Sequence, residues 1–404
     1  MSPSPSRRTR LLRELDRPGD AYRGIGPNWF ASVMGTGIVA NAAATLPFHV
    51  PGLHAVAVLG WLLATALLIA LTVATAALWT RQRAIARGHV ADPAMVIFFG
   101  APPMALLTVG AGTVLYGPGL LGRSAALGIG TALWSLGTLA GLACAVAVPY
   151  VMITRHRSRL DGVFATWLLP VVPPMVSAAT GPLLIPHVGG HEARLALFLA
   201  CYAMFGISLF ATLALLPLIW ARLFLHGTGP AVMVPTLFIV LGPLGQSVTA
   251  AHTIGAVAGD VLPAHLTGAC ADFALLYGVP VLGAALAWFA LAVVLGIRAR
   301  RRGLPFAMTW WSLTFPVGTC VTGASGLAAQ TRAEALRWAA VVLFLLLAAA
   351  WAVVGAHTAR GCLSGRLFRT PAAPPVPVPA AASDERVRVG AAPAFGRGGD
   401  AAGA

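Results

Sequence analysis

Lysine is absent from this chain, and charged residues of all kinds make up only 10% of its 404 residues. A soluble globular domain carries about 25% charged residues, so this composition is close to excluding a soluble multidomain protein. Hydrophobic residues reach 58%, and the mean hydropathy is +0.82. The composition therefore predicts an integral membrane protein of the all-α class.

The residues that metal, cofactor and catalytic sites need are also scarce. The five cysteines lack the spacing of a metal or redox site. Without lysine the chain cannot form the Gly-x-x-x-x-Gly-Lys-Ser/Thr loop of an ATP-driven pump. No acidic residue lies mid-way along an apolar stretch, where cation channels and carboxylate-based proton pumps carry one. We therefore expect no cofactor and no metal, and a membrane-embedded enzyme is disfavoured.

Apolar stretches long enough to cross a bilayer are what the chain does contain. A spanning helix needs about 20 mostly apolar residues. Ten stretches qualify, namely residues 27–46, 55–79, 94–116, 125–153, 163–186, 195–221, 231–258, 271–297, 306–329 and 338–358. The chain thus divides into an N-terminal tail (1–26), a ten-helix domain (27–358) and a C-terminal tail (359–404). The Pro- and Ala-rich composition of the C-terminal tail predicts disorder.

The arginines indicate the orientation of these segments. All 27 basic residues are arginine, and the formal net charge is +15. The two tails and the loops after the second, fourth, sixth and eighth segments hold all of them except Arg123, Arg194, Arg332 and Arg337. By the positive-inside rule, both termini face the cytoplasm of a plasma-membrane protein. Because the arginines lie between apolar segments, they indicate topology and not a nucleic-acid surface.

The odd-numbered segments differ from the even-numbered ones. Each odd segment contains a Gly or Pro with small polar residues, as in "FFGAPPMALLTVG" and "LTFPVGTCVTG", whereas even segments such as "LGWLLATALLIALTVATAALW" are mostly unbroken. Gly35, Gly100, Pro170, Gly242 and Pro316 mark the repeat, at spacings of 65, 70, 72 and 74 residues. We therefore expect five tandem helical hairpins. Because kinked backbone must be shielded from lipid, the five odd helices should form an inner ring around a central pore.

The pore predicted in this way is neutral and dotted with hydroxyls and amides, which can donate hydrogen bonds to an anion. The expected pore-lining residues are Ser32, Thr36, Thr108, Ser177, Thr180, Gln246, Ser247, Thr249, Thr314 and Thr319. The expected helix kinks are at Gly35, Gly37, Gly100, Pro102, Pro170, Pro173, Gly242, Pro243 and Pro316. Kinks also divide a helix dipole, so that half-helix N-termini can face an anion. This pattern favours transport of small anions or neutral solutes.

Two further residues invite a functional interpretation. His252 is the one histidine deep in an apolar segment and is a possible proton relay, or a neutral histidine that packs between helices. Phe315 precedes Pro316 in the middle of an odd segment. Its ring either closes the pore as a hydrophobic constriction or packs against a neighbouring helix.

Three motifs, "PNWFASVMGTGIVA", "LGPLGQS" and "WWSLTFPVGT", resemble those of the tellurite-resistance/dicarboxylate transporter family. This family includes slow anion channels, malate permeases and sulfite efflux pumps, and the resemblance covers roughly residues 25–358. It implies a ten-helix protomer of five hairpins, assembled as a homotrimer with a pore in each subunit. It also implies that a phenylalanine on the ninth helix plugs the pore, and Phe315 stands at that position here.

The resemblance leaves the transported anion open between two main candidates. "GPLGQ" and "WLLPVVPP" resemble the sulfite-efflux branch more than the malate branch. An arginine clamp, which would suit a dicarboxylate through bidentate pairing, is not evident inside the segments. We expect transport of sulfite or of a C4-dicarboxylate such as malate. The alternative is a voltage-driven, weakly selective channel for chloride and nitrate.

Overall fold

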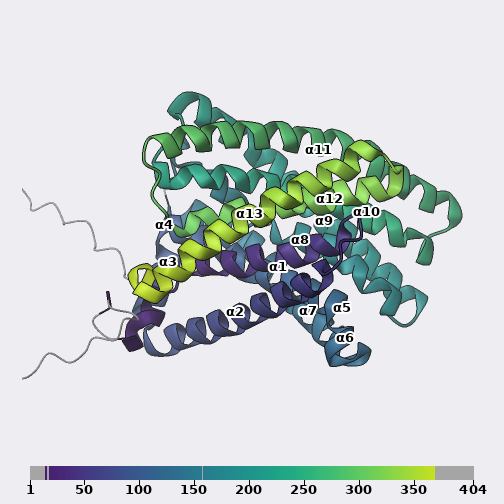
Figure 1. Cartoon of the computed structure of the whole chain (residues 1–404), viewed down its shortest axis with the longest axis horizontal. Helices are drawn as coiled ribbons and strands as arrows, with labels where there is room; N and C mark the ends of the chain where they lie inside the picture. The colour runs from purple at the N-terminus through teal and green to yellow at the C-terminus, as the bar shows by residue number, and fades with distance from the viewer. Residues whose placement is uncertain (1–13, 16–17, 157, 369–404) are drawn as a thin grey trace, which may run out of the picture. The chain divides into compact units, whose positions relative to one another are not determined.

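The computed structural model describes residues 14–15, 18–156 and 158–368, and every regular element in these ranges is a helix. Seven of the helices are long and apolar enough to cross a membrane. The chain is therefore an all-α integral membrane protein, as the composition predicts (Figure 1). Most of both predicted tails, residues 1–13, 16–17 and 369–404, lies outside the described residues.

Five long helices correspond to the even-numbered segments. They are α2 (Leu53–Arg81), α7 (Arg123–Arg155), α9 (His191–His226), α11 (Ala264–Arg301) and α13 (Glu334–Ser364). Only 22–28% of the most apolar stretch of each is buried, so most of their apolar surface faces outward. Apolar surface that the protein itself does not cover is stable in contact with lipid.

The odd-numbered segments are built differently, because each contains a 3-10 stretch before its main α-helical part. The α-helical parts are α1 (Phe30–Thr45), α5 (Ala101–Tyr116), α8 (Pro173–Thr180), α10 (Leu241–Val257) and α12 (Phe315–Thr331). The 3-10 parts that precede them are η2 (Pro27–Trp29), η3 (Ile97–Gly100), η5 (Ala165–Leu168), η8 (Ala231–Val240) and η10 (Met308–Leu313). After α8 the chain continues through η6 (Gly181–Leu183) and η7 (Ile185–His187).

Short elements connect the hairpins or extend their ends. They are η1 (Pro18–Gly24), α3 (Arg83–Ala91), α4 (Pro93–Val96), α6 (Pro118–Leu121), η4 (Leu160–Gly162), η9 (Ala258–Asp260) and η11 (Arg366–Phe368). Here the structure differs from the predicted tail boundaries. α13 runs past residue 358 to Ser364 and ends at Gly365, whose φ of +85° suits glycine. η1 occupies part of the predicted N-terminal tail.

The five inner helices form a closed ring. In chain order, α1 contacts α5, α5 contacts α8, α8 contacts α10, α10 contacts α12, and α12 returns to α1. The stretches Pro93–Tyr116 and Ala231–Asp260 are 67% and 78% buried, and α12 is buried over most of its length. The expected division into an inner set of odd helices and an outer set of even helices is therefore confirmed.

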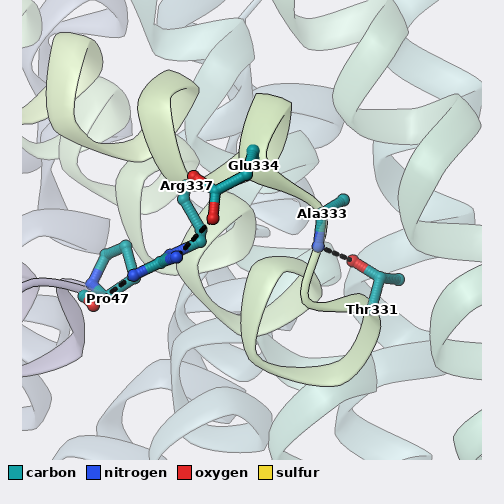
Figure 2. Close-up of polar contacts among 5 residues, drawn as sticks. All are labelled: Pro47, Thr331, Ala333, Glu334 and Arg337. Atoms are coloured by element: carbon teal, nitrogen blue, oxygen red, sulfur yellow. Dashed lines mark hydrogen bonds and ion pairs between the residues drawn. The ribbon is translucent and has the colours of Figure 1, made fainter.

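The last hairpin is also joined to the first near their loops, as Figure 2 shows. Arg337 of α13 extends between the Glu334 carboxylate, with which it forms an ion pair, and the backbone carbonyl of Pro47, 3.5 Å away. Its guanidinium lies over the Phe48 ring, 4.4 Å from the centroid. Because Pro47 and Phe48 lie in the connection from α1 to α2, this arginine holds the two ends of the ring together.

The predicted kinks prove to be mostly junctions between 3-10 and α-helix. Gly100 ends η3, and Pro102, Pro173 and Pro316 lie in the first turn of α5, α8 and α12, where a missing N–H costs nothing. Gly242 and Pro243 open α10, and Pro170 lies in the turn between η5 and α8.

Gly35 and Gly37 differ from this pattern, since α1 is one uninterrupted helix through both. Their small size serves packing. A Cβ atom at Gly35 would lie 2.2 Å from the Thr314 hydroxyl, and one at Gly37 would lie 2.7 Å from a Thr108 methyl group.

Gly100 allows the closest of these approaches. A Cβ atom there would lie 2.0 Å from the carbonyl oxygen of Leu169, which is backbone and cannot rotate away.

We expect Gly100→Ala to destabilise the fold by roughly 1–3 kcal/mol through overpacking, measured as a lower thermal unfolding temperature in detergent. Gly206→Ala is the matched control. It has open space around its Cβ position, so it should raise stability by about 0.5–1 kcal/mol. Equal effects of the two variants would contradict this account.

Candidate functional site

A cavity lies inside the ring, and all five inner segments line it. Its walls are Ala31, Met34, Phe98, Ala101, Met104, Leu169, Val172, Ile239, Gly242, Pro243, Met308, Trp311, Ser312, Phe315 and Pro316. None of these residues belongs to a long outer helix. The cavity therefore lies where the inner ring predicts a pathway, at the level where 3-10 helix changes to α-helix.

The cavity is narrow and apolar. The centres of water molecules can occupy about 40 Å³ of this cavity, which is room for roughly three waters. Ser312 carries the one hydroxyl among the lining residues, and none of those residues is charged. Methionine, phenylalanine and tryptophan supply most of the surface.

Phe315, the predicted gate, is one of the residues that line this cavity. It is the first residue of α12, and its side chain is 4% exposed. Thr314 before it has φ −107° and ψ −77°, and Pro316 follows it, so the ring stands at a fixed bend. Gly242 and Pro243 line the cavity from α10, and a Cβ atom at Gly242 would lie 3.9 Å from the Pro316 side chain.

The ten polar residues predicted to line the pore do not line this cavity. Three of them bind outer helices. The Thr36 hydroxyl accepts from the Trp351 indole of α13 at 3.1 Å, and the Ser177 hydroxyl accepts from Thr138 of α7 at 2.9 Å. Ser247 accepts from the Tyr277 hydroxyl of α11 at 2.8 Å. Hydroxyls that join transmembrane helices in this way strengthen packing.

Most of the other predicted hydroxyls bind backbone carbonyls three or four residues earlier. Ser32, Thr108, Thr180 and Thr314 donate to the carbonyls of Trp29, Met104, Val176 and Trp311. Such bonds satisfy a buried hydroxyl without any partner helix.

Thr249, Thr319 and Gln246 lie where α10 meets α12. The Thr249 hydroxyl is 2.6 Å from that of Thr322, and Thr319 donates to the Leu241 carbonyl at 3.1 Å. Gln246 is 4% exposed, and its amide oxygen has no hydrogen-bond partner in the described part of the chain. Gln246 follows Gly242 by one helical turn on α10, and its unpartnered atom is a hydrogen-bond acceptor, which cannot donate to an anion.

His252 packs between inner helices. Its ring lies on Gly326 of α12, where a Cβ atom would come within 2.6 Å of the imidazole. Whether it relays protons stays a prediction, as do the pathway roles of the ten polar residues.

Sequence reasoning missed Met34, Phe98, Met104, Trp311 and Ser312 as lining residues. It searched for polar side chains, whereas the narrow part of the pathway is apolar. The available signal was position, because several of these residues lie within a few places of the marked Gly and Pro positions.

Comparisons with known proteins agree with this architecture. Residues 24–359 match the family model described as voltage-dependent anion channel. The chain is 28% identical to the sulfite efflux pump of Arthroderma otae over 86% of this chain and 94% of that protein. It is also 28% identical to the sulfite efflux pump of Trichophyton rubrum, over 86% of this chain and 94% of that protein. An uncharacterized transporter of Methanocaldococcus jannaschii is 26% identical over 89% of this chain and 99% of that protein. The chain belongs to the voltage-dependent anion channel family and is an anion transporter.

Proposed function

We propose that this protein carries sulfite out of the cell through the cavity inside its inner ring. The fungal relatives that it matches over most of their length are sulfite efflux pumps. A single observation carries the proposal, namely a cavity that all five inner segments line and to which no acidic or basic side chain contributes. The pathway therefore contains no fixed charge of the kind that attracts cations.

The direction of the inner helices favours anions at the cytoplasmic mouth. Each outer helix brings the chain back to the side of the membrane on which the preceding inner segment began. The five inner segments therefore run parallel, and their N-terminal ends point toward the cytoplasm. The positive ends of their dipoles thus face the side from which sulfite leaves. This orientation rests on the arginine distribution, which places both termini in the cytoplasm.

The apolar lining favours singly charged over doubly charged anions. Moving an ion from water into a less polar space costs energy that grows with the square of its charge. Bisulfite should therefore pass more easily than the sulfite dianion or a C4-dicarboxylate dianion. The lack of an arginine pair among the lining residues also leaves a dicarboxylate without a bidentate partner.

The second candidate is a voltage-driven channel with weak selectivity among chloride, nitrate and other monoanions. The description of the matching family favours it. In both candidates Phe315 acts as the gate, the protein lies in the plasma membrane, and the assembly is a homotrimer with one pathway in each subunit. C4-dicarboxylate transport ranks below both because of its charge.

The first test is anion flux into liposomes that contain the purified protein. We expect sulfite, chloride and nitrate to move faster than malate, with protein-free liposomes as the background. At fixed total sulfite, flux should fall as rising pH converts bisulfite to the dianion. Faster malate than sulfite flux would overturn the proposed substrate. Flux that follows voltage with little preference among monoanions would establish the channel.

If Phe315 is the gate, Phe315→Ala should raise anion flux by roughly tenfold or more, because lowering the barrier to passage by about 1.4 kcal/mol already gives that factor. Phe238→Ala is the matched control. Phe238 is similarly buried, 6% exposed, but its ring packs against Phe289 of α11 and does not line the cavity. That variant should lose stability without gaining flux. If Phe315→Ala folds normally and conducts like the wild type, Phe315 is not the gate.

If His252 relays protons, His252→Gln should abolish the response of flux to an imposed pH gradient. Without a gradient, the flux of this variant should stay within about twofold of the wild-type flux, a change of less than 1 kcal/mol in the barrier. His265→Gln, at an exposed histidine of α11, controls for the loss of a histidine. An unchanged response in His252→Gln would leave this residue a packing role only.

A further inference from the structure

A second apolar space lies on the outside of the ring, between α1, α2 and α13. We call it the α2–α13 groove. Its volume is about 440 Å³, which is within the range of small-molecule sites. Its lining residues are Ile25, Trp29, Ser32, Thr36, Leu63, Leu67, Ala70, Leu71, Trp311, Trp351, Gly355, Thr358, Ala359, Cys362 and Phe368.

The polar atoms along the groove are already engaged. The Thr36 hydroxyl accepts from the Trp351 indole, and the Thr358 hydroxyl accepts from the Trp311 indole, each at 3.1 Å. The Ser32 hydroxyl donates to the Trp29 carbonyl at 2.7 Å. The groove therefore presents hydrocarbon and aromatic surface, and a hydrated or strongly polar ligand would gain little there.

The position of the groove indicates which apolar ligand reaches it. α2 and α13 are outer helices whose most apolar stretches are each 28% buried, and Leu63 on the groove wall is 45% exposed. In a bilayer this surface meets acyl chains. At the groove's other end Arg360 and Arg366, both exposed, lie within a few residues of Ala359, Cys362 and Phe368. An arginine pair beside an apolar groove at the cytoplasmic interface is complementary to an anionic phospholipid headgroup.

One residue joins this groove to the cavity. Of the described residues that line either space, Trp311 alone lines both. Its indole N–H is held by Thr358 of α13, and its ring lies on Gly35 of α1, where a Cβ atom would come within 2.6 Å. Phe315 follows four residues later, as the first residue of α12, so the groove and the proposed gate are four residues apart along the chain.

We infer that the α2–α13 groove binds one acyl chain of an anionic phospholipid and that this chain holds Trp311 against the cavity wall, which favours the closed gate. The coupling to flux rests on the proposed role of Phe315, whereas the binding of the lipid does not. With the groove empty, Trp311 has space to move away from the cavity. Anion flux therefore depends on whether the surrounding acyl chains fit the groove.

The binding is tested by native mass spectrometry of delipidated protein titrated with dioleoyl phosphatidylglycerol. Gly355 lines the groove and has open space around its Cβ position, so Gly355→Leu fills the groove without a clash. Gly283→Leu is the control, because Gly283 is exposed on α11 with equally open space. The wild type and Gly283→Leu should retain a tightly bound phospholipid for each chain, and Gly355→Leu should lose it. Free inorganic phosphate should not compete.

Equal lipid retention by all three proteins would overturn the site. So would a change in oligomeric state of Gly355→Leu at unchanged lipid count, since the groove would then be covered by a second copy of the chain. Competition by free phosphate with no dependence on the acyl chain would indicate an arginine-bound anion instead, and would also overturn the proposal.

The coupling is tested by flux in liposomes of dioleoyl or of diphytanoyl phosphatidylglycerol. The methyl branches make the phytanoyl chain wider than an oleoyl chain, so we expect it to fit the groove less well. Sulfite and chloride are measured in parallel, so that the wrong choice of substrate does not obscure the result. Wild-type flux should be at least about threefold higher in the branched lipid, within the range that coupling through packed side chains produces. Gly283→Leu should behave like the wild type, and Gly355→Leu should give equal flux in both lipids. A ratio in Gly355→Leu that matches the wild type would refute the coupling even if the lipid binds.

Discussion

Close contact among the inner helices is the constraint on which the rest of this structure depends. Each inner segment changes from 3-10 to α-helix part-way along its length. Prolines at several of these junctions remove N–H donors, and irregular backbone at membrane depth is tolerated where protein surrounds it. The ring solves this by surrounding each junction with protein. Glycine makes the contact possible. At Gly245 a Cβ atom would lie 2.6 Å from the backbone nitrogen of Cys320, so α10 and α12 approach at backbone distance.

The same packing determines the chemistry of the pathway. A buried hydroxyl needs a hydrogen-bond partner, and in a ring this tight the nearest partner is a neighbouring helix or the preceding turn. Ser177 and Thr36 take partners on α7 and α13, which leaves methionine, phenylalanine and proline to line the cavity. An ion that crosses such a space loses water without gaining many hydrogen bonds. If anions cross here as proposed, charge and hydration energy limit which anion passes, and an aromatic ring would suffice as a gate.

The sequence allowed the architecture to be predicted but not the faces of its helices. Gly and Pro at intervals of 65 to 74 residues separated inner from outer segments correctly, because the need to shield broken backbone leaves a mark in composition. An inner helix is buried on every side, however, so it has no polar stripe to show which side faces the pathway. The pathway role predicted for Ser247 therefore rests on its residue type alone, and its hydroxyl binds Tyr277 of an outer helix. The position of Phe315 before Pro316 and the family resemblance predict a gating role for Phe315. The sequence contains no comparable feature that predicts a role for Trp311.

The geometry of η10 explains how three consecutive residues come to serve three different surroundings. A 3-10 helix has three residues per turn, so neighbours point about 120° apart and residues three positions apart are aligned. Trp310 accordingly lines a groove beside α11, Trp311 lines both the α2–α13 groove and the cavity, and Ser312 lines the cavity alone. Met308 and Trp311, three positions apart in η10, line the cavity together. An α-helix, with 3.6 residues per turn, would spread these side chains differently. The 3-10 form of this segment therefore allows one short element to line both the α2–α13 groove and the cavity, directly before the helix that begins at Phe315.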